Sequence, residues 1–131
     1  MKELKDIQSL EDIQHLVNTF YTQVQQHTLI GPVFNSRIQD RWPEHLEKMY
    51  RFWQTVLLDK QTYFGSPFPP HATLPINETH FDAWLSLFTN TVDNHFAGEK
   101  AEEAKWRAHK MATMFISKIN YYRKNSAQPL V

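Results

Sequence analysis

The chain has 131 residues, of which fourteen are basic and fourteen acidic, and it contains no cysteine. A chain of this length buries a sizeable core, so we expect a single domain over residues 1–131, with 1–8 and 123–131 loosely ordered. The missing cysteine excludes disulfides, iron–sulfur clusters and Cys-ligated zinc. The balanced charge gives no positive field that would hold nucleic acid or an anionic membrane.

No stretch of the sequence has the apolar length of a signal peptide or of a membrane span, which needs roughly 20 residues. We therefore expect a cytoplasmic protein that binds neither membranes nor nucleic acid. A phosphate-binding glycine loop and the motifs G-x-S-x-G and H-E-x-x-H are missing, which removes most enzyme classes that such motifs mark. The hairpin dipeptides Asn-Gly and Asp-Gly are missing too, and this favours helices over sheets.

The first predicted helix covers residues 10–27. Ser9 and Asp12 form a start signal of the capping-box kind, and apolar residues then recur at helical spacing. Tyr21 lies on the inner face of this helix. Large aromatic residues there usually only pack, with the hydroxyl bonded to a backbone group, so a packing role and a site role both stay open.

Gly31-Pro32 ends this helix and starts a short turn, after which the second predicted helix spans residues 40–59. His45, Met49 and Trp53 follow one another at i, i+4 on its inner face. A histidine at the start of an apolar stripe is more often half-buried and hydrogen-bonded than a ligand. Both readings of His45 therefore remain open at this point.

Residues 59–77 form a long predicted loop, and loops of this length in compact domains are usually functional. His71 lies at its centre, surrounded by prolines at positions 67, 69, 70 and 75. Proline fixes φ and removes an N–H donor, so the loop is stiff and cannot be an ordinary helix. This arrangement suits a histidine that presents one ring nitrogen to an apolar pocket.

Two more helices follow the loop. Asn77 can cap a helix with Phe81, Trp84 and Phe88 inward, and Gly98 separates it from the last helix. The expected fold is all-α, with four substantial helices. None of the seven histidines has the His-x3-His or Glu-x-x-His spacing of a zinc or di-iron site. A porphyrin supplies four iron ligands itself, so haem is the cofactor that a single rigid histidine serves best.

The order and spacing of several motifs resemble the group III truncated haemoglobins, a branch of the two-on-two globins, from Leu10 to Phe115. These motifs are FY at 20–21, IGPVF at 30–34, WPEHLEKM at 42–49, FW at 52–53, Y-x-G-x-P-x-x-x-H-x-x-L at 63–74 and HFDAWLSLF at 80–88. The resemblance implies two helix pairs packed as a sandwich around haem b, with the usual proximal helix reduced mostly to loop.

The same resemblance implies the residues of the site. The iron ligand would be His71, and His80 is the competitor, although a helix there would turn His80 toward packing or solvent. The distal side would hold Tyr21, Trp84 and His45. The residues expected to contact the haem are Phe20, Phe34, Lys48, Met49, Phe52, Trp53 and Phe88, and Arg41 and Arg51 are further candidates for pairing with its propionates.

The implied function is binding of dioxygen, nitric oxide and carbon monoxide at ferrous iron. Hydrogen bonds from Tyr21 and Trp84 would hold oxygen firmly, which favours nitric oxide dioxygenase, nitric oxide reductase or pseudo-peroxidase chemistry over oxygen transport. Such redox chemistry needs an electron donor, which the sequence does not identify. We expect a monomer or a weak dimer.

A different class of function also fits the composition. Aromatic stripes at helical spacing usually form a core, so a haem-free helical interaction or regulatory module is the alternative. A peroxidase proper ranks lower, because the distal arginine that polarises peroxide is missing. The proline-flanked His71, together with Tyr21 and Trp84, distinguishes the haem hypothesis, since a packing-only bundle has no need of it.

Overall fold

The structure is a computed structural model that describes residues 3–63, 65 and 76–124. In these residues it contains five helices and no strand, and the predicted all-α fold is confirmed. None of the described helices is long and apolar enough to cross a membrane. The helices are α1 (Leu10–Gln26), α2 (Gly31–Ile38), α3 (Trp42–Leu58), α4 (Glu78–His95) and α5 (Glu99–Lys124).

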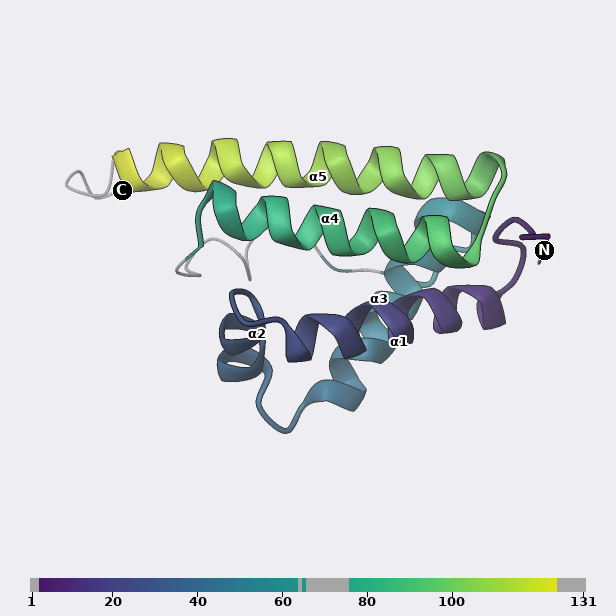
Figure 1. Cartoon of the computed structure of the whole chain (residues 1–131), viewed down its shortest axis with the longest axis horizontal. Coiled ribbons are helices and arrows are strands. Elements are labelled where there is room, and N and C mark those ends of the chain that lie inside the picture. The colour runs from purple at the N-terminus through teal and green to yellow at the C-terminus, as the bar shows by residue number, and fades with distance from the viewer. Residues whose placement is uncertain (1–2, 64, 66–75, 125–131) are drawn as a thin grey trace.

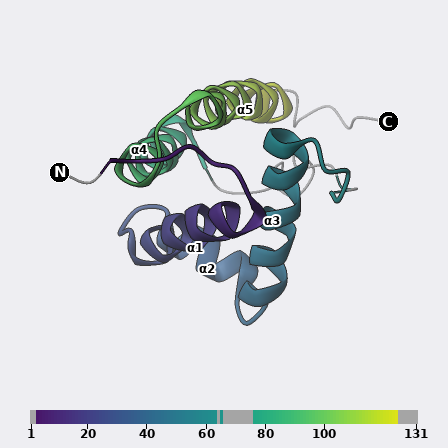
Figure 2. The same ribbon diagram turned by 90° about the vertical axis from the view of Figure 1, so that its right-hand side faces the viewer.

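Two helix pairs form two layers. α4 and α5 lie side by side and antiparallel in one layer, and α1 and α3 cross each other in the second (Figures 1 and 2). α1 also packs against α4, which joins the layers, and the short α2 packs against α1. The two-on-two arrangement implied by the sequence is therefore present.

The core lies where α1 meets the other helices. The stripe predicted for α1 is buried, and Phe88 and Val92 of α4 and Leu57 of α3 close over it. Full burial of a large apolar side chain contributes about 1.5–3 kcal/mol, so this stripe is the main stabilising feature of α1. Its members are Ile13, Leu16, Val17, Phe20, Tyr21 and Val24.

The predicted start of α1 is confirmed in a modified form. The Ser9 hydroxyl accepts a hydrogen bond from the N–H of Asp12 at 3.3 Å, as an N-cap should. The Asp12 carboxylate accepts from the N–H of Gln8 at 2.9 Å and pairs with Lys5 at 3.2 Å. In a standard capping box the Asp12 carboxylate would accept from the N–H of the N-cap, Ser9; here it accepts from the N–H of the residue before it, Gln8.

The segment after Gly31-Pro32, which was predicted to be a short turn, forms the helix α2. Pro32 lies in the first turn of α2, where its missing N–H leaves no bond unmade and its fixed φ suits the helix. A Cβ atom on Gly31 would lie 2.8 Å from the carbonyl oxygen of Gln25. Glycine therefore lets α2 begin directly against the end of α1.

Two of the first described residues make tertiary contacts within the segment 1–8, which was expected to be loosely ordered. Ile7 is 1% exposed. Asp6 accepts hydrogen bonds from the N–H groups of Ile7, Lys100 and Ala101 at 2.8–2.9 Å, so its carboxylate serves the start of α5 from outside that helix. Gly98, with φ +138°, makes this approach possible, because a Cβ atom there would lie 2.5 Å from Asp6 Cγ.

Candidate functional site

A cavity of about 640 Å³ lies between the two layers, which is within the range of roughly 300–1,000 Å³ of small-molecule and cofactor sites. Side chains of all five helices line it. Those on α3 include His45, Met49 and Trp53, so the inner stripe predicted at i, i+4 faces the cavity as expected. Most of the remaining lining is aromatic or aliphatic, which suits a large flat apolar group.

Tyr21 and His45 form one wall. Tyr21 is 5% exposed, and its ring packs against Phe34 and Trp42, with ring centroids 6.0 and 5.8 Å away. The Nε2 atom of His45 is buried in the same wall. Burial raises the pKa of the Tyr21 phenol far above its usual range, so this hydroxyl keeps its proton and remains a hydrogen-bond donor.

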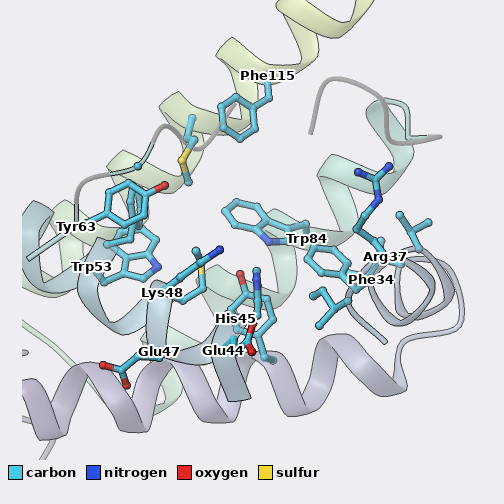
Figure 3. A pocket seen from close by; sticks show the side chains of 18 of the residues that line it. Phe34, Arg37, Glu44, His45, Glu47, Lys48, Trp53, Tyr63, Trp84 and Phe115 are labelled. Carbon is cyan, nitrogen blue, oxygen red and sulfur yellow. The ribbon is translucent and has the colours of Figure 1, made fainter. Parts of the chain in front are cut away.

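Trp84 reaches the cavity from α4, and Figure 3 shows its indole ring directed into the open space. Phe88 stacks on Trp84 with ring centroids 5.7 Å apart, and Trp53 stacks on Phe88 at 5.0 Å. Phe20 meets Trp84 edge-on at 5.7 Å. Such pairs contribute about 0.5–1.5 kcal/mol each beyond burial, so the orientation of the indole is firmly set.

The structure places the expected cofactor contacts in two shells. Phe20 and Phe88 lie behind Trp84 in the core rather than in the cavity wall. Five others face the cavity directly: Phe34, Lys48, Met49, Phe52 and Trp53.

The mouth of the cavity is polar, and its basic residues differ in their existing partners. Arg51 is held by Glu47 through two contacts, at 2.8 and 2.9 Å, and Arg41 donates to the carbonyl oxygen of Arg37 at 3.0 Å. Lys48 forms no ion pair within the part of the chain that the structure describes. Its amine points into the cavity in Figure 3, which makes it the readiest cation for an acidic group there.

Tyr63 is a cavity residue to which the sequence assigned no role. The Thr55 hydroxyl accepts hydrogen bonds from the N–H groups of Thr62 and Tyr63 at 3.1 and 3.0 Å, which ties this segment to α3. The Tyr63 ring packs edge-on against Phe52, and its hydroxyl is directed toward the cavity (Figure 3). Burial raises the pKa of this phenol as well.

His80 also lines the cavity, although its side chain was expected to be directed toward packing or solvent. It occupies the third position of α4 and completes a capping box. Asn77 accepts from the N–H groups of Thr79 and His80, and the N–H of Asn77 donates to Nδ1 of His80 at 3.2 Å. The helix cap that the sequence predicted at Asn77 is confirmed. His71, the other candidate iron ligand, lies outside the described residues.

The last helix, α5, supplies one face of the cavity, although its inward residues were expected only to pack in the core. Met111, Ala112 and Phe115 of α5 line it, and Figure 3 shows Phe115 above Trp84. The apolar period of α5 could have indicated the inward direction of these residues. It could not indicate that they border open space, because core and cavity residues share the same spacing.

Comparisons with known proteins agree with this arrangement. The family described as bacterial-like globin matches residues 6–118. The protein "Group 3 truncated hemoglobin ctb" of Campylobacter jejuni is 31% identical over an alignment of 116 residues, which covers 86% of this chain and 91% of that protein. The crystal structure of group III truncated hemoglobin from Campylobacter jejuni matches with a TM-score of 0.82 and 29% identity, covering 89% of this chain and 95% of that one.

The fold and the cavity define a bacterial-like globin. The chain belongs to the group III truncated haemoglobins, as its motifs indicated. Membership of the truncated globin family implies binding of small ligands at a haem.

Proposed function

We propose that this chain binds haem b in the cavity between its helix layers and, at ferrous iron, dioxygen and other diatomic gases. The haem would supply the iron at which a gas molecule binds. The observation that carries the proposal is the large aromatic cavity with a buried phenol, Tyr21, in its wall and a cation, Lys48, at its mouth. A flat apolar group with carboxylates at one edge fits this distribution of surfaces.

His71 is the proposed iron ligand, on the basis of the motif that contains it. The prolines around it restrict the backbone on both sides, so the imidazole would lose little further freedom when it binds iron. His80 is less suited to this role. Its Nδ1 atom accepts a hydrogen bond from the N–H of Asn77, which puts the proton of the neutral ring on Nε2, the nitrogen that iron would need. Its place in the first turn of α4 also contributes to the stability of that helix.

Tyr21 and Trp84 are the proposed donors to bound dioxygen. Oxygen bound at a ferrous haem would carry partial negative charge, and donors in a dry cavity would stabilise that charge more than water would. At about 1.5 kcal/mol for each hydrogen bond to a charged acceptor, the two donors together would slow oxygen release by roughly 100-fold. His45, next to Tyr21, is a third polar group on this side.

The apolar walls hold the cofactor and exclude water. Phe34, Met49, Phe52 and Trp53 would contact the porphyrin, with Phe20 and Phe88 supporting them from behind. Lys48 would pair with a propionate, because Arg51 is already paired with Glu47. An ion pair at an exposed mouth contributes little affinity, so most of the binding free energy comes from burial of the ring.

Firm retention of oxygen makes a poor carrier. We therefore propose that the protein senses or scavenges small ligands, or reacts bound oxygen, nitric oxide or peroxide with the help of an electron donor, rather than transporting oxygen. Absorption spectra of the purified protein with one equivalent of hemin test this. An intense Soret band that shifts with carbon monoxide after reduction is expected. A colourless protein that ignores hemin would instead support a haem-free interaction module.

A further inference from the structure

Two histidines from different helices meet on the surface, away from the cavity. His15 is an exposed residue of α1, and His95 is the last residue of α4. The Nε2 atom of His15 lies 3.1 Å from the Nδ1 atom of His95, although 80 positions separate the two residues in the sequence. Their rings are nearly perpendicular, with centroids 4.8 Å apart. The function proposed above gives this pair no role.

The nitrogen separation matches that of two ligands on one metal ion. Imidazole nitrogens bind zinc at about 2.0–2.1 Å, so two of them lie about 3.4 Å apart at a tetrahedral angle and about 2.9 Å apart at a right angle. The observed 3.1 Å falls between these values. The spacing of the two nitrogens therefore already suits one shared ion.

The chemistry of the pair points to a first-row transition metal. Neutral imidazole suits Zn²⁺, Ni²⁺ and Cu²⁺, whereas Ca²⁺ and Mg²⁺ require oxygen ligands. One of the two facing nitrogens carries a proton in the hydrogen-bonded pair. That proton moves to the other nitrogen of the same ring when metal binds, so both rings stay neutral. Glu11, one helical turn before His15, adds a negative charge that favours a cation nearby.

We propose that His15 and His95 bind one divalent transition-metal ion of the zinc class, with water as the remaining ligands. The ion joins the first half of α1 to the end of α4. These are the helices that carry Tyr21 and Trp84, so the metal stabilises the packing on which the cavity wall depends. Because the site binds the folded chain and not the separated helices, metal raises the stability by mass action.

Calorimetric titration of Zn²⁺ into the protein tests the site, both with and without bound hemin. We expect one zinc ion per chain for the unmodified protein. His15→Gln and His95→Gln should each lower the affinity at least tenfold, since glutamine keeps a polar side chain but is a weak zinc ligand. His109→Gln, which changes an exposed histidine of α5, is the matched control and should bind zinc normally.

Thermal unfolding gives an independent measurement. Zinc at 100 times the Kd of the unmodified protein should raise Tm by at least about 5 °C in that protein and in His109→Gln, and by about half as much or less in either variant of the pair. Absence of zinc binding, or binding that survives both His15→Gln and His95→Gln, would overturn the proposal. Because the titration needs no hemin, failure here is distinct from failure of haem binding.

Discussion

The ring of Tyr21 on α1 meets the imidazole of His45 on α3 edge to face, with centroids 5.1 Å apart and ring planes at 88°. Trp42 packs against both rings, at 5.8 and 5.6 Å. This cluster fixes the phenol in a buried place where its raised pKa keeps it a donor at all physiological pH values. In the proposed distal site, Tyr21 would therefore donate to a bound ligand without reorganisation.

Tyr21→Phe is expected to speed oxygen dissociation from the ferrous protein by about tenfold or more, because it removes one hydrogen bond to a partly anionic oxygen. Stopped-flow displacement of oxygen by carbon monoxide measures this rate. Tyr50→Phe is the control, since Tyr50 bonds to Asn18 at the surface and does not face the cavity. An unchanged rate in Tyr21→Phe would remove this residue from the distal network.

Trp84→Phe should have a similar effect, about tenfold, because phenylalanine keeps an aromatic ring but lacks the indole N–H. The double variant of Tyr21 and Trp84 should approach roughly 100-fold if the two donors act independently. The same displacement experiment measures these rates, with Trp106→Phe, a change at an exposed tryptophan, as the control. A double variant no faster than either single variant would mean that the two donors act as a unit, each effective only while the other is in place.

The sequence predicted the helical residues Tyr21, His45 and Trp84 of this cavity better than Tyr63 or the lining residues of α5. Tyr21, His45 and Trp84 were expected to gather around one site, and they line one cavity. Spacing along a helix indicates such residues because a periodic stripe has only one inward direction. Tyr63 was overlooked because its position depends on a hydrogen bond to the Thr55 hydroxyl, across the end of α3, which helical periodicity does not indicate.

Lys48→Gln should increase the rate of haem loss by up to about fivefold, as the loss of an exposed ion pair would. Transfer of haem to an excess of another apoglobin measures this rate. Arg51→Gln should have a smaller effect, because Glu47 already holds Arg51. With the dimethyl ester of haem, which lacks the carboxylates, Lys48→Gln and the unmodified protein should lose the cofactor equally fast. A difference that persists with the ester would show that Lys48 acts otherwise.

Asp6 should make stability depend on acid pH. Partial burial pushes the pKa of its carboxyl up, but hydrogen bonds from the N–H groups of Lys100, Ala101 and Ile7 outweigh this and hold it below the usual value. The stabilisation is therefore complete above the unfolded pKa, about 3.9, and is lost as pH falls through the folded value.

Asp6→Asn should thus cost about 1 kcal/mol at neutral pH, as loss of a good cap does, and less near pH 3, where loss of this stabilisation has begun. Urea unfolding at the two pH values measures this difference. Asp82→Asn, at an exposed carboxylate of α4, is the control and should change little. An equal loss of stability at both pH values would mean that the charge of Asp6 is not involved.

Two features at the ends of elements depend on contacts outside the local sequence. Residues 1–8 were expected to be loosely ordered, and within their described part Asp6 and Ile7 make contacts with α5 and the core. α2 was expected to be a turn because Gly-Pro usually interrupts helices, and here the same pair begins one. Both outcomes depend on tertiary neighbours that the local sequence does not contain.

The central claim is that the cavity holds haem through His71, and titration of the haem-free protein with hemin tests it most directly. His71→Gly should fail to form the normal ferrous spectrum until imidazole is added, whereas His80→Gln, which keeps a side chain suited to the capping box of α4, should bind one equivalent of hemin normally. A normal spectrum in His71→Gly together with loss of binding in His80→Gln would contradict the account and assign the iron to His80.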